Sequence, residues 1–125
     1  MVLLDSDILI DYLRRYPPAL AFFKDLDLKE AAISTITHME LIRGCKKKVH
    51  AQTVDKLVKN FKSIAITPAI SQKTIKIYRN HKWQTHLEIG DAFIAATALT
   101  NKVTLLTRNL KHFQALEGLS LVKPY

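Results

Sequence analysis

The sequence predicts an α/β fold with three layers, in which helices cover both faces of a central parallel sheet of four or five strands. Short apolar segments alternate along the chain with longer segments whose apolar residues recur every three or four positions. Strands buried on both faces need a helical layer on each side. Of the 125 residues, 48% are hydrophobic and 24% are charged, an ordinary globular composition that argues against disorder.

The length of the chain is typical of one domain, and we expect residues 1–125 to form it. A chain of this size buries about two-thirds of its surface on folding, enough for one core but not two. The one cysteine, Cys45, excludes an intrachain disulfide and a zinc site built from cysteines. There is no apolar run of about 18 residues and no basic leader, so we expect a cytoplasmic protein without a membrane span.

Five short apolar segments are predicted to be the strands: residues 2–4, 31–34, 64–66, 103–106 and 119–122. The first helices are indicated by their ends. Ser6 can cap a helix over residues 7–15, which the two prolines at 17 and 18 end. Thr37 can cap a helix that ends near Gly44.

The later helices are indicated by spacing. An amphipathic helix is predicted from four residues at positions i, i+3, i+4 and i+7: Val54, Leu57, Val58 and Phe61. Thr67 and Pro68 begin the next helix, and residues 81–87 are predicted to be a loop. A helix over residues 91–100 is rich in alanine, which permits close packing on a sheet.

The charge balance is the first indication of function. Nineteen Lys and Arg against eleven Asp and Glu give a net charge of +8, which favours a polyanionic partner, nucleic acid first. Because acidic residues are few, their positions are informative.

Ligands of open α/β sheets bind outside the carboxyl ends of the strands. Asp5 follows the first predicted strand, Glu40 lies in the first turn of the helix after the second, and Asp91 opens the helix before the fourth. Each also has a structural interpretation: Glu40 in a capping box with Thr37, and the aspartates at turns or helix starts. Together, however, clustered carboxylates cost stability unless a cation neutralises them. Oxygen ligands alone suit Mg²⁺ or Mn²⁺, and a basic protein around them suggests phosphodiester chemistry.

Four segments of the chain resemble the PIN-domain nucleases and, within them, the VapC-type ribonuclease toxins: residues 2–10, 33–44, 90–99 and 105–113. The order and spacing of these segments match those of the family over nearly the whole chain. The resemblance implies a single PIN-like domain and a metal-dependent endoribonuclease that acts as the toxin of a toxin–antitoxin pair. It also implies a homodimer and a small cognate antitoxin.

The family's catalytic, metal-binding acids correspond here to Asp5, Glu40 and Asp91, and Ser6 matches the small hydroxyl residue that supports the first aspartate. Many relatives have a fourth acid where this chain has Asn109, a weaker, neutral oxygen ligand, which leaves open whether one or two metal ions bind. His112 is interpreted as a residue of a helix surface in preference to a catalytic one.

In the predicted mechanism, Asp5 and Asp91 hold the metal, and Glu40 binds it or orients a metal-activated water that attacks phosphorus. Single-stranded or loop RNA is the expected substrate, since a splayed backbone must reach the carboxylates. Basic side chains are predicted to position it: Arg43, Lys46, Lys47, Lys48, Arg108 and Lys111.

Two other functions stay open. A non-catalytic nucleic-acid-binding module, whose acids are only helix caps, predicts RNA binding that Mg²⁺ does not affect. A haloacid-dehalogenase-like phosphatase would use Asp5 as nucleophile and Asp7 as general acid, although Leu9 replaces the expected threonine. The apolar Phe22 and Phe23 fit either a partner surface or the core.

Overall fold

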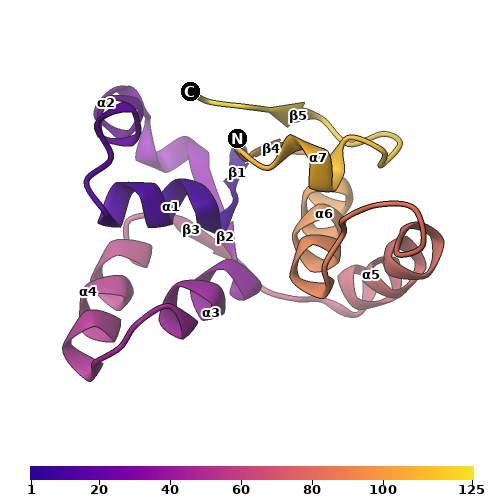
Figure 1. Cartoon of the computed structure of the whole chain (residues 1–125), viewed down its shortest axis with the longest axis horizontal. Helices are drawn as coiled ribbons and strands as arrows, with labels where there is room; N and C mark the ends of the chain where they lie inside the picture. The colour runs from indigo at the N-terminus through magenta and orange to yellow at the C-terminus, as the bar shows by residue number, and fades with distance from the viewer.

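The computed structural model describes residues 1–125 and confirms the predicted fold class: five parallel strands form one sheet in the order β3-β2-β1-β4-β5 (Figure 1). The strands are β1 (Val2–Leu4), β2 (Ala31–Ser34), β3 (Lys62–Ile64), β4 (Thr104–Leu106) and β5 (Leu121–Val122). The helices are α1 (Ser6–Leu13), α2 (Pro17–Asp25), α3 (Thr35–Arg43), α4 (Lys48–Val58), α5 (Pro68–His81), α6 (Ile89–Asn101) and α7 (Leu110–Phe113), with a 3-10 turn at Leu28–Glu30. No helix is long and apolar enough to cross a membrane.

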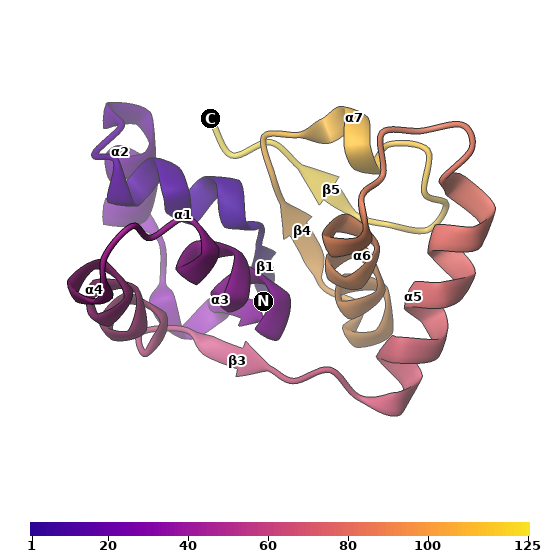
Figure 2. The ribbon, with the colours of Figure 1, turned by 60° about the horizontal axis from the view of Figure 1, so that its bottom comes forward.

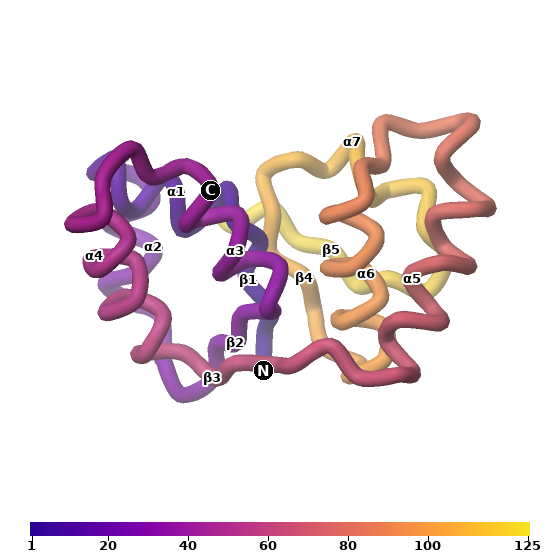
Figure 3. Tube along the Cα trace, turned by 90° about the horizontal axis from the view of Figure 1, so that it is seen from below, coloured from indigo at the N-terminus to yellow at the C-terminus, as the bar shows by residue number.

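The side chains of the central strands alternate between two cores. Leu3, Ala32 and Leu105 stand side by side in the sheet and pack against α5 and α6. Leu4 and Leu106 point to the opposite face and pack against α1 and α4. Figure 2 shows α1–α4 gathered on one side and α5–α7 on the other, and in Figure 3 the segment after β3 carries the chain between the two groups. This alternation explains why β1 and the Leu105–Leu106 part of β4 carry apolar residues on both faces of the sheet.

The apolar side chains of α2 are used in packing within the chain. Phe22 and Phe23 are half-buried against the core formed with α1 and α4. Phe23 makes edge-on ring contacts with Tyr12 and Phe61, at centroid distances of 4.8 and 6.1 Å. Of the two interpretations of this aromatic pair, the structure supports core packing.

Several predicted boundaries need correction. The helix α4 ends at Val58, so Phe61 packs on the core from the segment after it. The third strand lies at residues 62–64 instead of 64–66, because an edge strand with exposed Lys62 and Ser63 has no apolar run to mark it. The first helix begins at Ser6, and Asp5 is its N-cap. The third helix begins at Thr35 and is capped by Ser34, whose hydroxyl accepts a hydrogen bond from the backbone N–H of Thr37 at 3.1 Å.

Candidate active site

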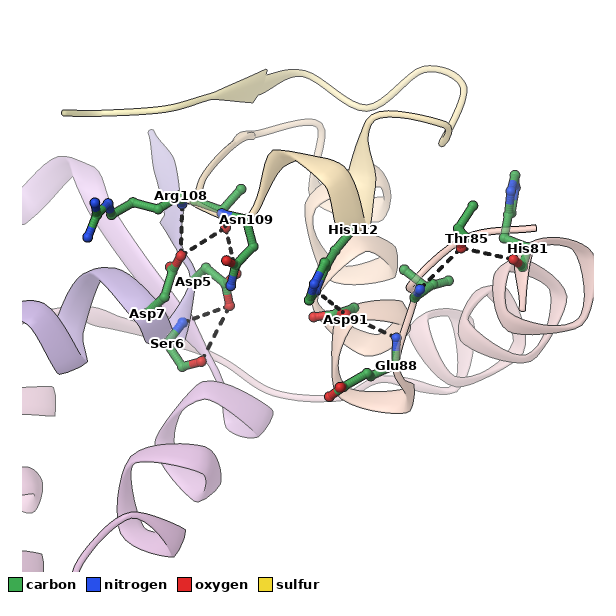
Figure 4. Close-up of polar contacts among 12 residues, drawn as sticks. Asp5, Ser6, Asp7, His81, Thr85, Glu88, Asp91, Arg108, Asn109 and His112 are labelled. Atoms are coloured by element: carbon green, nitrogen blue, oxygen red, sulfur yellow. Dashed lines mark hydrogen bonds and ion pairs between the residues drawn. The ribbon is translucent and has the colours of Figure 1, made fainter. Parts of the chain in front are cut away.

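Asp5 lies at the carboxyl end of β1, in the middle of the sheet, and is only 4% exposed. One carboxylate oxygen accepts a hydrogen bond from the backbone N–H of Ser6 at 2.7 Å (Figure 4). The other accepts a hydrogen bond from the hydroxyl of Thr107, directly after β4, at 2.8 Å. Burial, together with the charge of Asp7, raises the pKa of Asp5 to about 7 in spite of these hydrogen bonds. The ionised form of this side chain therefore needs a compensating positive charge.

Asp7, in the first turn of α1, is a second carboxylate of the site. Its Oδ2 accepts a hydrogen bond from the backbone N–H of Arg108 (2.8 Å) and lies 3.3 Å from the hydroxyl oxygen of Thr107. Its Oδ1 is buried and has no hydrogen-bond partner. Burial raises the pKa of Asp7 as well. The sequence interpretation considered Asp7 only for the phosphatase alternative and missed Thr107, although its place directly after β4 was a usable signal.

Glu40 reaches the site from α3 and faces the start of α6. Its Oε2 lies 3.1 Å from the position that a Cβ on Gly90 would occupy, and its Oε1 is buried without a partner. Because the helix is capped by Ser34, Glu40 is not the capping-box partner of Thr37 and lies in the second turn instead of the first. Burial raises the pKa of Glu40, and the neighbouring Ser6 side chain and Arg43 oppose this. Its carboxylate is thus available for a ligand.

Asp91 stands in the first turn of α6 and is held from two sides. Its Oδ2 accepts a hydrogen bond from the backbone N–H of Glu88 (3.0 Å) and lies 3.0 Å from Nδ1 of His112. Burial raises the pKa of Asp91, while the Glu88 N–H and His112 lower it. His112 lies on the short α7 with its side chain 30% exposed, and its ring faces Asp91, a contact that the sequence did not predict (Figure 4).

Asp91 lies within electrostatic reach of the other two predicted acids, Asp5 and Glu40. The charge of Asp91 contributes to the raised pKa of both Asp5 and Glu40. The three carboxylates do not converge on a common point. No three carboxylate, imidazole or thiol groups of the chain are arranged to hold a metal ion. The donor set nevertheless fits a hard divalent cation, because it consists of buried oxygens with raised pKa values and includes the unpartnered Oε1 of Glu40.

Asn109, the predicted weak ligand, stands just before α7 and is exposed. Its backbone N–H donates to the Thr107 hydroxyl (3.0 Å), and its side chain makes no hydrogen bond to the protein. Its role as a ligand therefore stays a prediction.

Most of the predicted RNA-binding residues are exposed. Five of the six have exposed side chains: Arg43, Lys46, Lys47, Lys48 and Lys111. Arg43 is next to Glu40, with Nη2 3.9 Å from Oε2. Arg108 differs, because its guanidinium pairs with Asp11 at 2.8 Å. A hollow of about 410 Å³ borders α7 and includes Arg108, Lys111, His112 and Lys123 in its lining.

Replacing Gly90 with alanine is expected to lower any activity that depends on Glu40 without destabilising the protein. The added Cβ would displace the Glu40 carboxylate by a few tenths of an ångström. Alanine favours the helix by roughly 0.5–1 kcal/mol over glycine. The melting temperature should therefore stay the same or rise while kcat falls. A variant with full activity would show that the position of Glu40 is not critical.

Comparisons with known proteins agree with this geometry. The model of the PIN domain family matches residues 2–119. Ribonuclease VapC1 of Methanocaldococcus jannaschii is 34% identical over 96% of this chain and 84% of its own length. Ribonuclease VapC10 of Mycobacterium tuberculosis is 33% identical over 95% of this chain and 90% of its own length.

Two solved structures extend the comparison. The toxin–antitoxin complex from Klebsiella pneumoniae contains a chain with a TM-score of 0.83 and 32% identity, over 100% of this chain and 98% of that one. The DNA-bound VapBC complex from Salmonella typhimurium, at 21% identity, supports the fold alone, with a TM-score of 0.85 over 99% and 98% of the two chains. With a matching family model and relatives of this similarity over nearly its whole length, the chain belongs to the PIN-domain family and to its VapC group.

Proposed function

We propose that the protein is a metal-dependent endoribonuclease, the toxin of a toxin–antitoxin pair, formed by one domain of residues 1–125. The observation that supports this proposal is that Asp91 lies within electrostatic reach of both Asp5 and Glu40, and that burial raises the pKa of all three carboxyl groups, in a strongly basic chain. The relatives are named ribonucleases, which supports RNA as the substrate. The phosphatase and the passive binding module have no comparable support.

Asp5, Glu40 and Asp91 are the proposed ligands of Mg²⁺ or Mn²⁺, with Asn109 as a weaker one. When bound, such a cation lowers the pKa of a water molecule and neutralises charge at the scissile phosphate. The residues of the chain contribute orientation: Ser6 and Thr107 hold the Asp5 carboxylate, and His112 holds that of Asp91. The unpartnered Oε1 of Glu40 is an acceptor for a proton of the attacking water.

Single-stranded or loop RNA is the proposed substrate class, because carboxylates recessed between helices are reached more easily by a flexible backbone than by a duplex. Arg43 stands beside Glu40, and Lys111 lines the hollow beside His112. These cations would contact phosphates on the two sides of the scissile bond. We place the reaction in the cytoplasm.

Two protein partners are proposed. An antitoxin segment fits the groove between α1, α3 and α4, a cavity of about 300 Å³ whose apolar lining includes Ile10, Leu13, Leu41 and Val54. The likeness to the Klebsiella toxin–antitoxin complex supports such a partner. A homodimer contact fits the surface around Met39 and Ile89, which are 59% and 61% exposed.

The test is cleavage of an end-labelled single-stranded RNA by the purified chain in Mg²⁺ or Mn²⁺, compared with EDTA. Internal cleavage that needs the cation and leaves 5′-phosphate and 3′-hydroxyl ends is the expected result. Release of terminal phosphate alone would favour the phosphatase, and binding without cleavage would favour the passive module. Undiminished cleavage in EDTA would contradict the metal dependence.

A further inference from the structure

Arg108 joins the active site to a cluster that lies outside it. Its backbone N–H donates to Asp7 Oδ2 at 2.8 Å, and its Nη1 pairs with Asp11 Oδ2 at 2.8 Å. The hydroxyl of Tyr125 donates to the same Asp11 oxygen at 2.9 Å. The rings of Tyr16 and Tyr125 lie against the guanidinium, at 5.1 and 5.3 Å from their centroids. We call Asp11, Tyr16, Arg108 and Tyr125 the arginine clasp.

The guanidinium in the clasp is occupied by contacts within the chain. The Arg108 side chain is 35% exposed and its Asp11 partner 18%, whereas the side chain of Arg43 is 79% exposed. A carboxylate neutralises the charge, and the faces of two aromatic rings attract it as well. Its Nε is buried without a partner. Arg108 is therefore poorly suited to bind an RNA phosphate.

The same residue fixes the loop that holds Asp5. Thr107 precedes Arg108, and its hydroxyl donates to Asp5 Oδ2 at 2.8 Å and accepts from the backbone N–H of Asn109 at 3.0 Å. A hydroxyl has one proton to donate. At 2.8 Å from Asp5, compared with 3.3 Å from Asp7, that proton serves Asp5. The position of the loop over residues 107–109 therefore sets the orientation of the Asp5 carboxylate.

The clasp ties this loop to α1, the helix that begins directly after Asp5. Asp7 binds the loop backbone on the first turn of α1, and Asp11 binds the Arg108 side chain one turn later. Asp5 is thus held between α1 and the loop over residues 107–109, which are joined by the Asp7 and Asp11 contacts. A shift of either element would move the Thr107 hydroxyl relative to the carboxylate.

We propose that Arg108 is a positioning residue for Asp5: the arginine clasp fixes the loop over residues 107–109 on α1 and so orients the carboxylate through Thr107. The inference rests on the proposed function, in which Asp5 is a metal ligand. It gives Arg108 a role different from the RNA contact predicted from the sequence, and it makes Tyr125 part of the support of the site.

The test compares Arg108→Ala and Tyr125→Phe with two matched controls. Arg79→Ala removes an exposed arginine from α5, and Tyr12→Phe removes a hydroxyl that makes no hydrogen bond. Calorimetric titration of the metal-free chain with Mn²⁺ measures cation affinity, and steady-state cleavage separates kcat from the KM for RNA. Loss of residues that orient a metal ligand typically weakens metal binding by about 10–100-fold.

We expect Arg108→Ala to weaken Mn²⁺ binding by about tenfold or more and to lower kcat, with the KM for RNA changed less than about twofold. Tyr125→Phe, which keeps the ring, should show the same pattern at about two- to fivefold. Arg79→Ala and Tyr12→Phe should match the wild type in Mn²⁺ affinity, kcat and KM. A raised KM with unchanged Mn²⁺ affinity would overturn the proposal and identify Arg108 as an RNA contact.

Circular dichroism decides whether each variant folds. If Arg108→Ala does not fold, Tyr125→Phe decides alone, and wild-type Mn²⁺ affinity in that variant overturns the proposal. Wild-type protein that binds no Mn²⁺ also overturns it. Wild-type protein that binds Mn²⁺ but cleaves no RNA would refute the proposed function, while the Mn²⁺ affinities of the variants would still decide the role of the clasp.

Discussion

Replacing Asp5 with asparagine is expected to abolish RNA cleavage while making the metal-free protein more stable at pH 8. Asparagine keeps the shape of the side chain, and its one amide oxygen can still accept the hydrogen bond of the Ser6 N–H. Its NH2 group then faces the Thr107 hydroxyl and must donate to that oxygen, where Asp5 accepts from it. Asparagine lacks the negative charge that a divalent cation needs. We expect kcat to fall by at least about 10³-fold, which corresponds to about 4 kcal/mol of activation free energy.

The gain in stability follows from the burial of Asp5. Its pKa is raised from 3.8 to about 7 in the folded protein, so ionising it above pH 4 costs folding free energy. The difference sets an upper bound of about 4 kcal/mol, at about 1.36 kcal/mol per pKa unit. Thermal unfolding at pH 8 without metal measures the gain.

The matched control for this substitution is Asp25→Asn, at the exposed end of α2. It should change neither kcat nor the thermal stability at pH 8. An Asp5→Asn variant that cleaves RNA at the wild-type rate would contradict the role of Asp5 as a metal ligand. A variant that unfolds at lower temperature would show instead that the hydrogen bonds of the carboxylate outweigh the cost of its burial.

The part of the site found from sequence is the part fixed by topology. Asp5 follows a recognisable strand, and Asp91 lies in the first turn of a recognisable helix. The carboxyl ends of parallel strands meet at one edge, so their positions could be deduced without any side-chain geometry.

The part that was missed depends on contacts across long separations in sequence. His112 meets Asp91 across 21 residues, and Arg108 meets Asp11 across 97. The four-residue α7 is too short to show a periodicity that would orient His112. Ser34 and Thr37 are both good caps, so sequence alone does not rank them, and the position of Glu40 in its helix was misjudged for that reason.

The stability of the metal-free protein is expected to fall as the pH rises from about 4 to about 8. The carboxyl groups with a pKa raised mainly by burial are Asp5, Asp7, Glu40 and Asp91. Between the unfolded and folded pKa values the folded protein binds more protons than the unfolded chain, so the free energy of unfolding decreases with pH. For Asp5 this window runs from pH 3.8 to about 7.

A cation that binds these carboxylates should reverse the trend, because it prefers their ionised form. We expect Mn²⁺ to raise the melting temperature clearly at pH 8 and little at pH 5. At a free concentration 100 times the dissociation constant, binding adds about 2.7 kcal/mol to the free energy of unfolding. In Asp5→Asn the profile without metal should be flatter and the shift by Mn²⁺ smaller, whereas Asp25→Asn should match the wild type. An equal shift at pH 5 and pH 8 would mean that Mn²⁺ binds elsewhere, since binding to carboxylates with raised pKa values must weaken as the pH falls through this range.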